Sequence, residues 1–182
     1  LVEAAIGQLV RVFGPEAGAV EIEPNLEKAH RRLADMLFRT EDYRGASEHY
    51  LKAIRLGPGP DYVYSRLMAV GVMFIKQADT KLAISHFERV LAIKPDLPEA
   101  HYTLANLLKR DNNTDEAIAH YQQAIELRPG YYKAHNNLAN ALLNKGKLEE
   151  AIAHYRAALK INPDYTEAQR NLDSVLRLKS NP

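Results

Sequence analysis

The segment Pro95-Asp-Leu-Pro-Glu-Ala-His101 recurs 34 residues later as Pro129-Gly-Tyr-Tyr-Lys-Ala-His135. The same offset holds further along both stretches, in the pairs Leu104/Leu138, Ala105/Ala139, Leu108/Leu142, Ala117/Ala151, Tyr121/Tyr155 and Ala124/Ala158. A fixed period of this length indicates stacked supersecondary units. We therefore interpret the rest of the chain as further copies of this unit with caps at its ends.

The repeat extends toward both ends of the chain in six columns of similar residues. They are Leu33, Val70, Leu104, Leu138 and Leu172; Ala34, Gly71, Ala105 and Ala139; Ala46, Ala83, Ala117 and Ala151; Tyr50, Phe87, Tyr121 and Tyr155; Ala53, Val90, Ala124 and Ala158; and Pro58, Pro95, Pro129 and Pro163. The spacing is 34 residues except between the first two copies, where it is 37. The extra residues fall in the loop-like segment Gly57-Pro-Gly-Pro-Asp61, and a longer connection there costs little loop-closure entropy.

Each copy predicts two helices joined by a short turn. In the third copy the pattern predicts helices over Pro98–Arg110 and Thr114–Leu127, with Thr114 as the N-cap of the second helix. The alanine columns predict points where two helix axes approach closely, and the aromatic column is expected to fill the wider gap. Because one helical hairpin cannot bury its apolar face alone, the copies are expected to stack.

These columns, at this period, resemble the tetratricopeptide repeat over about Leu26 to Leu178. The resemblance implies an all-α fold, a right-handed α-α superhelix of four helix-turn-helix repeats with an N-terminal helical segment and a C-terminal capping helix. The expected bounds are 1–25 for the N-terminal segment, 26–60, 61–96, 97–130 and 131–164 for the repeats, and 165–182 for the capping helix. The sequence departs from the family pattern where tryptophan is usual, at His30, Leu67, His101 and His135.

The two ends of the chain read as caps. Residues 2–13 carry an apolar stripe at helical spacing, which predicts an amphipathic helix. This helix either stacks on the first repeat or occupies the groove of this molecule or a neighbour. In the last helix, Asp173 replaces the usual alanine or glycine, as a polar outer face requires.

Composition excludes several classes of function. The net charge is +1 and 26% of residues are charged, which favours neither nucleic acid nor membrane as a partner. The longest apolar run, Leu67 to Ile75, is far shorter than the ~20 residues of a membrane span. There is no cysteine, which fits a reducing compartment, and we expect a cytoplasmic location. Because the chain begins at Leu1, a larger parent protein stays open.

No catalytic, metal or cofactor site is expected. The histidines fall in two columns, one on each helix of the repeat: His30, His101 and His135, and His49, His86, His120 and His154. Equivalent positions of stacked repeats lie roughly 10 Å apart, too far to share a metal ion, so packing between helices is the expected role. Serine, histidine and acidic residues show no triad pattern, and the chain is predicted not to be an enzyme.

The resemblance implies that the first helix of each repeat lines a concave groove. The candidate peptide-binding residues there are Arg31, Met68, Val72, Tyr102, Asn106, Asn136, Asn137, Asn140, Asn144 and Asn171. Asparagine carries donors and an acceptor that match a peptide backbone, and Asn106/Asn140 and Asn137/Asn171 are each one repeat apart. The alternative is that these asparagines face water or bridge neighbouring helices. Met68, Val72 and Ile75 predict an apolar patch on this inner surface.

Some family members clamp the C-terminal carboxylate of a heat-shock chaperone with lysines, an arginine and asparagines. Counted from the third repeat, this chain supplies Asn106 and Asn137 but has Tyr102, Glu167 and Asn171 where the cations belong. Counted from the first, it supplies Arg31 but has Asp35, Ala69, Glu99 and Thr103 elsewhere. We therefore expect no chaperone-tail binding.

The expected function is a non-catalytic scaffold for protein–protein interaction that holds an extended peptide or partner segment in the groove. Two alternatives stay open. The chain is a substrate-recruiting segment of a larger enzyme such as a glycosyltransferase, or it self-assembles into a homo-oligomer through its N-terminal helix.

Overall fold

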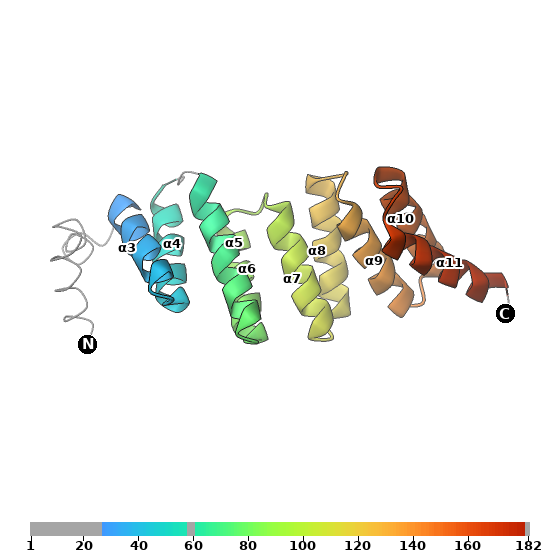
Figure 1. The fold of residues 1–182 in the computed structure, drawn as a ribbon, viewed down its shortest axis with the longest axis horizontal. Helices are drawn as coiled ribbons and strands as arrows, with labels where there is room; N and C mark the ends of the chain where they lie inside the picture. The colour runs from blue at the N-terminus through green and yellow to red at the C-terminus, as the bar shows by residue number, and fades with distance from the viewer. Residues whose placement is uncertain (1–26, 58–60, 181–182) are drawn as a thin grey trace. The chain divides into compact units, whose positions relative to one another are not determined.

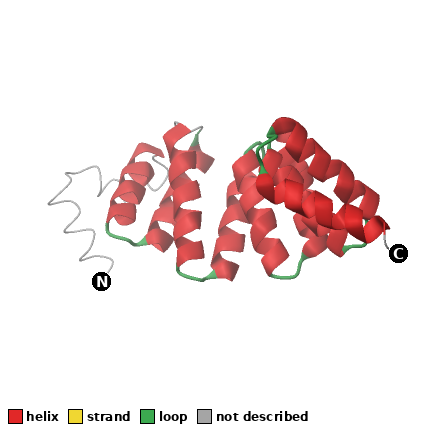
Figure 2. Ribbon diagram, turned by 45° about the vertical axis from the view of Figure 1, so that its right-hand side comes forward, coloured by secondary structure: helices red, strands yellow, loops and turns green. Residues whose placement is uncertain are grey.

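The structure, a computed structural model, describes residues 27–57 and 61–180. Within these ranges the chain forms α-helices joined by short turns, and the described residues contain no strand (Figure 2). The all-α prediction is confirmed there. The chain divides into two compact units, residues 1–93 and residues 94–182. The predicted helix at 2–13, like the whole 1–25 segment, lies outside the described residues.

Unit 1 consists of two helical hairpins in its described part. They are α3 (Glu27–Arg39) with α4 (Tyr43–Leu56), and α5 (Asp61–Lys76) with α6 (Thr80–Ile93) (Figure 1). Helix α4 packs against α3, α5 and α6, so it joins the two hairpins.

Unit 2 contains two hairpins and a further helix. They are α7 (Pro98–Arg110) with α8 (Thr114–Leu127), α9 (Tyr132–Asn144) with α10 (Leu148–Ile161), and α11 (Thr166–Ser180). The predicted bounds of α7 and α8 are confirmed, but the predicted N-cap is wrong by one residue. The carbonyl of Asn113 accepts the first helical bond, from Ala117 N–H at 3.0 Å, so Asn113 is the N-cap and Thr114 is already helical.

The turn inside every hairpin has the same backbone form. Glu41, Ala78, Asn112 and Gly146 all have φ between 60° and 74°, and each lies two residues before the second helix begins. The next residue then donates its N–H to a carbonyl five positions back, as in Asn113 to Leu108 at 2.8 Å. This bond satisfies a carbonyl at the end of the first helix and reverses the chain.

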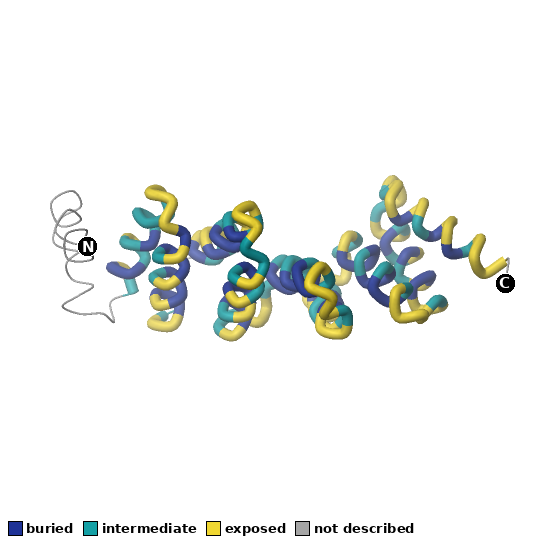
Figure 3. The backbone as a smooth tube through the Cα atoms, turned by 90° about the horizontal axis from the view of Figure 1, so that it is seen from below, coloured by how far each residue is buried: buried dark blue, intermediate teal, exposed yellow. Residues whose placement is uncertain are grey.

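The small-residue columns form the helix crossings. Ala46, Ala83, Ala117 and Ala151 have no exposed surface, and the aromatic column is at most 1% exposed. In Figure 3 the buried residues lie along the faces that the helices of each unit turn toward one another. None of the described helices is long and apolar enough to cross a membrane.

Gly71 marks a close crossing of α5 and α6 in unit 1. A Cβ atom added at Gly71 of α5 would lie 2.3 Å from Cζ and 2.7 Å from Cε2 of Phe87 on α6. Phe87 is fully buried, so its ring has no room to withdraw. Glycine at this position, where most repeats have alanine, is what allows the phenylalanine ring to fit.

Gly71→Ala is expected to lower the free energy of unfolding by about 1–3 kcal/mol, because the new methyl group overpacks the Phe87 ring. Urea unfolding of the full chain measures the change. The matched control is Gly130→Ala, where an added Cβ meets nothing within 4 Å and the expected change is within about 0.5 kcal/mol. Equal effects of the two substitutions would contradict this account of the crossing.

Candidate functional site

The side chain of Asn106 joins three helices of unit 2. Its Oδ1 accepts a hydrogen bond from the Tyr121 hydroxyl of α8 at 2.6 Å. The same oxygen accepts a second bond from Nδ2 of Asn137, on α9, at 2.8 Å. Both lone pairs of this carbonyl oxygen are therefore used within the protein.

The same junction recurs one repeat later. Oδ1 of Asn140 accepts from the Tyr155 hydroxyl at 2.5 Å and from Nδ2 of Asn171, on α11, at 3.3 Å. Asn106 and Asn140 thus hold equivalent places on the neighbouring first helices α7 and α9. The hydroxyl in each case comes from a tyrosine whose ring lies in the core.

Asn137 and Asn171 each make a second bond to the preceding first helix. Nδ2 of Asn137 donates to the Tyr102 hydroxyl at 3.1 Å, and Nδ2 of Asn171 donates to Oδ1 of Asn136 at 3.1 Å. Asn136 has no exposed surface, and its own Nδ2 donates to Oδ1 of Asn137 at 3.2 Å. Six of the predicted groove residues therefore form one network, and Asn137 and Asn171 use their donors to bridge helices.

Glu167 determines which side-chain amides of this network donate and which accept. Nδ2 of Asn136 lies 3.1 Å from Oε1 of Glu167, and an ionised carboxylate can only accept. Asn136 must therefore turn its NH₂ group toward Glu167 and toward Oδ1 of Asn137. Asn137 and Asn171 then face the preceding helix with their NH₂ groups, and this arrangement makes Asn106 and Asn140 accept through Oδ1.

The orientation leaves the amide nitrogens of Asn106 and Asn140 without a protein partner among the described residues. Every buried side-chain nitrogen or oxygen in that part of the chain has a partner, so solvent must reach these two Nδ2 atoms. Both asparagines are half-buried. The first-helix face of unit 2 therefore presents two fixed N–H donor groups, one on α7 and one on α9, whose acceptor oxygens are already saturated.

Four half-buried tyrosines lie beside the network, at the beginnings of α7, α9 and α11. We call them the tyrosine ledge: Tyr102, Tyr131, Tyr132 and Tyr165. Ring centres are 4.9 Å apart between Tyr102 and Tyr131 and also between Tyr132 and Tyr165. Burial, with Tyr102 nearby, raises the pKa of Tyr131 to about 12, and burial together with Glu167 raises the pKa of Tyr165. The hydroxyls of Tyr131 and Tyr165 therefore stay protonated at neutral pH.

The other predicted groove residues lie apart from this network. Asn144, at the end of α9, is exposed. In unit 1, Arg31 on α3 pairs with Glu27 at 2.8 Å and lies over the Tyr62 ring, 5.8 Å from its centre. Met68 and Val72 lie on α5, where Val72 is 42% exposed and Met68 is half-buried.

Unit 1 has an aspartate at the position of Asn106 and Asn140. Oδ1 of Asp35 accepts from the Tyr50 hydroxyl at 2.6 Å, and Oδ2 accepts from the Tyr62 hydroxyl at 3.2 Å. Arg66 lies at 4.0 Å from the same carboxylate. The position therefore accommodates a carboxylate while keeping the bond from the buried tyrosine.

The histidines of the two columns pair within a repeat. The Nδ1–Nδ1 distances are 2.8 Å for His30/His49, 2.9 Å for His101/His120 and 3.0 Å for His135/His154. His101 Nε2–H donates to the Pro95 carbonyl at 2.9 Å, and its Nδ1 shares a hydrogen bond with Nδ1 of His120. Packing between helices was the expected role. The pairing of a histidine in one column with a histidine in the other was not predicted, because the repeat aligns residues only within a column.

The geometry of these pairs is that of a hydrogen bond. Ring centres 5.0–5.3 Å apart place the two nitrogens nearly in line between the rings. Two imidazoles on one metal would instead tilt so that their lone pairs converge on a third point. In the described ranges, 27–57 and 61–180, no three His, Asp or Glu side chains are grouped closely enough to hold a metal ion.

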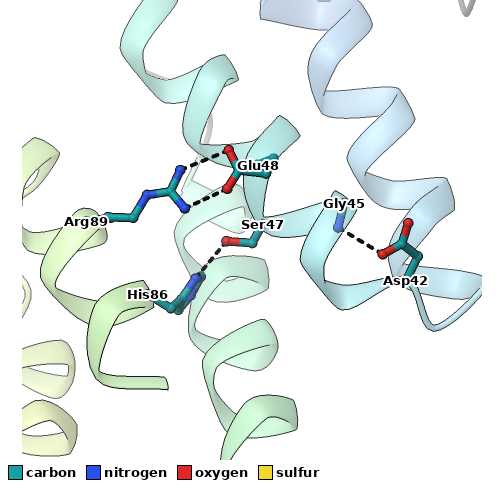
Figure 4. A network of polar contacts seen from close by, with 6 residues as sticks. All are labelled: Asp42, Gly45, Ser47, Glu48, His86 and Arg89. Carbon is teal, nitrogen blue, oxygen red and sulfur yellow. Dashed lines mark hydrogen bonds and ion pairs between the residues drawn. The ribbon is translucent and has the colours of Figure 1, made fainter. Parts of the chain in front are cut away.

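His86 is the exception, because Leu67 occupies the place of its partner histidine. Its Nδ1 accepts from the Ser47 hydroxyl of α4 at 2.8 Å, and its Nε2–H donates to the Leu67 carbonyl at 2.9 Å (Figure 4). The other repeats have isoleucine at the position of Ser47. A serine and a leucine thus compensate each other. Beside this pair, the Arg89 guanidinium donates two hydrogen bonds to the Glu48 carboxylate, at 2.6 and 2.9 Å.

Several residues of the site were missed by the sequence reasoning. Tyr121 and Tyr155 were read as core residues, although each lies 15 positions after the asparagine that it contacts. Tyr50 and Asp35 show the same spacing. This recurring offset was a signal that the columns alone did not reveal. Glu167 and the tyrosines at 131, 132 and 165 carried no pattern, since they come from turns and helix starts.

Comparisons with known proteins agree with the fold. One tetratricopeptide repeat family model matches residues 102–166 and another matches residues 74–120, so together they cover about half of the chain. The chain belongs to the tetratricopeptide repeat family. A search of curated proteins found no match.

Solved structures of this family have the same fold. A crystal structure of MamA matches with a TM-score of 0.66 and 21% identity, over 85% of this chain and 82% of MamA. The first TPR of Spaghetti (RPAP3), bound to the HSP90 peptide SRMEEVD, matches with a TM-score of 0.61 and 24% identity. The match covers 63% of this chain and 91% of that one. YrrB, a TPR protein with an unusual peptide-binding site, matches with a TM-score of 0.59 and 22% identity. The match covers 93% of this chain and 86% of YrrB. The predicted fold class, the all-α superhelix of tetratricopeptide proteins, is confirmed by these likenesses.

The buried histidines are expected to make stability fall on acidification. Burial lowers the pKa of His86 to about 4, and burial together with nearby His30 lowers that of His49 to about 4. Between pH 6.5 and pH 4 the unfolded chain therefore binds more protons than the folded one, so stability is complete above pH 6.5 and declines below it. For fully buried His86 the loss is about 2–3 kcal/mol by pH 4.5.

Urea unfolding at a series of pH values measures this decline, with His86→Gln as the matched variant. Glutamine does not titrate, and its amide is able both to donate to Leu67 and to accept from Ser47. The difference in unfolding free energy between wild type and variant should therefore change by the amount expected for His86. A difference that stays constant from pH 7 to pH 4.5 would refute the assignment.

Proposed function

We propose that this protein is a non-catalytic interaction scaffold, and that the first-helix face of unit 2 binds an extended segment of a partner protein. The observation that carries the proposal is the pair of unpartnered amide donors on Asn106 and Asn140. They occupy equivalent places on neighbouring helices, and the Tyr121 and Tyr155 hydroxyls hold them in position. A regularly spaced pair of donors suits the regularly spaced carbonyl groups of a peptide backbone.

The role of the asparagines differs from the ladder expected from the sequence. Asn137 and Asn171 have their donors occupied within the chain and act as braces. Asn106 and Asn140 are the residues that we assign to the ligand. Pre-organisation favours binding, because the donors lose little freedom when a ligand arrives.

A carboxylate is a poor candidate for the bound group. The cation positions of the chaperone-tail clamp hold Tyr102, Glu167 and Asn171, and Glu167 adds a negative charge beside the network. An acidic C-terminus would meet repulsion there rather than a counter-charge. We therefore assign the donors to neutral backbone carbonyls, and the proposal does not extend the HSP90 peptide of Spaghetti to this chain.

The proposal includes the absence of catalysis and a cytoplasmic location. Ser47 and His86 form a buried pair, at 4% and 2% exposure, and both ring nitrogens of His86 are engaged in holding helices together. The absence of cysteine from the sequence suits a reducing compartment. Residues 2–13, through which self-assembly would occur, lie outside the described residues. The second proposal is that this segment docks on the apolar patch of Met68 and Val72.

Peptide selection tests the proposal. Peptides are selected from a random displayed library on the full chain, and their affinities for wild type and for an Asn106→Asp/Asn140→Asp variant are then measured. Aspartate keeps an Oδ1 acceptor for Tyr121 and Tyr155 but replaces each outward donor by an oxygen. Asp35 shows that the position tolerates it. Selected peptides should bind the variant about five- to 150-fold more weakly, since two hydrogen bonds of ~0.5–1.5 kcal/mol each are lost.

Asn144→Asp is the control, because it makes the same chemical change on α9 outside the network. It should leave affinity within about twofold, and the peptide SRMEEVD should bind neither wild type nor variants measurably. Urea unfolding verifies that each variant is folded. Failure to select any peptide, or selected peptides that bind the double variant as well as wild type, would refute the proposal.

A further inference from the structure

At Asn106 and Asn140, the first-helix face of unit 2 offers amide donors but no free amide acceptors. Both lone pairs of Oδ1 are occupied in Asn106 and in Asn140, while both Nδ2 groups reach solvent. An ordinary peptide brings an N–H donor for every carbonyl acceptor, and on such a surface its N–H groups would lose water without gaining a partner. Proline brings the carbonyl and has no N–H. The polarity of the surface therefore matches a segment rich in proline.

The spacing of the two donors agrees with the conformation that such a segment adopts. Bonds from Asn137 to Tyr102 and Asn106 place α7 and α9 next to each other, and packed helices have axes about 8–10 Å apart. A polyproline II helix has three residues per turn and a rise of about 3.1 Å, so its carbonyls point the same way every ~9 Å. In a β-strand the equivalent carbonyls recur every ~6.6 Å, which fits the spacing less well.

The tyrosine ledge provides the apolar part of such a site. Its four rings are half-buried and form two contacting pairs, Tyr102 with Tyr131 and Tyr132 with Tyr165. The Arg128 guanidinium lies 5.0 Å from the centre of the Tyr131 ring. Aromatic surfaces with hydrogen-bond donors beside them are the usual docking sites for polyproline II segments. Rigid rings cost little conformational entropy when a ligand packs on them.

We propose that unit 2 binds a proline-rich segment in the polyproline II conformation, its carbonyls accepting from Asn106 and Asn140 and its rings packing on the tyrosine ledge. The inference rests on the proposed function and names the class of ligand. Glu167 is a positioning residue in this site: by accepting from Asn136 it keeps the donors of Asn106 and Asn140 turned outward.

The test is a titration of the full chain with an N-acetylated, C-amidated proline decamer. Binding is monitored by NMR, through the chemical shifts of the asparagine side-chain amides. A decamer of alternating glycine and serine is the flexible control. The proline decamer should bind and shift the Asn106 and Asn140 amide signals, and the control should bind at least about tenfold more weakly because it loses more freedom and offers no rings. Affinity should rise between three and six prolines, the length at which both donors are spanned.

Three variants separate the parts of the site. Asn106→Asp/Asn140→Asp and Tyr131→Leu should each weaken decamer binding roughly tenfold, whereas Asn144→Asp should not change it. Glu167→Gln should weaken it as well, since a side-chain amide no longer forces one direction on the network. Urea unfolding confirms that each variant is folded.

The outcomes distinguish this inference from the function on which it rests. If library selection yields peptides that depend on Asn106 and Asn140, but the proline decamer does not bind, the ligand class is wrong and the peptide-binding function stands. If neither the decamer nor any library peptide binds, both are overturned. A decamer that binds without shifting the two amides, or equally well to Asn106→Asp/Asn140→Asp, overturns the proposed site.

Discussion

The two helices of every described hairpin approach so closely at one point that only alanine or glycine fits between them. Ala46, Ala83, Ala117 and Ala151 are fully buried at this crossing, and Gly71 faces the ring of Phe87 across another. A larger residue would separate the helices and expose the aromatic column behind them. Every other feature of the repeats, including the direction in which the tyrosines project, depends on this distance.

The crossing also connects the core to the candidate site. Tyr121 and Tyr155 have buried rings, yet their hydroxyls reach the asparagines on the first-helix face. One side chain thus fills the space between helices and orients a donor at the surface. Since the ring has a single position in the packed core, the hydroxyl has a single position too. Because the core is rigid, the asparagines of the site are held in place before a ligand binds.

Buried polar groups show how the repeat tolerates variation. Three repeats pair a histidine on the first helix with one on the second, and the remaining repeat replaces one partner by Leu67. His86 would then keep an unsatisfied ring nitrogen, but Ser47 supplies the missing partner from the preceding hairpin. An unpaired buried polar atom costs more than a hydrogen bond contributes, which explains why a departure at one position accompanies another that is distant in sequence.

Periodicity alone was enough to predict the helices of the described residues, their order and the buried columns, because burial against a neighbouring repeat demands the same residue type every 34 positions. It also located Asn106 and Asn140 on the first helices. It did not separate donors that brace the fold from donors that remain free, since all five asparagines of the network have the same chemistry. That division follows from Glu167, an acceptor brought to Asn136 by α11, and from tyrosine hydroxyls 15 residues away. Hydrogen-bond direction is a property of the assembled network, and no single column of the sequence contains it.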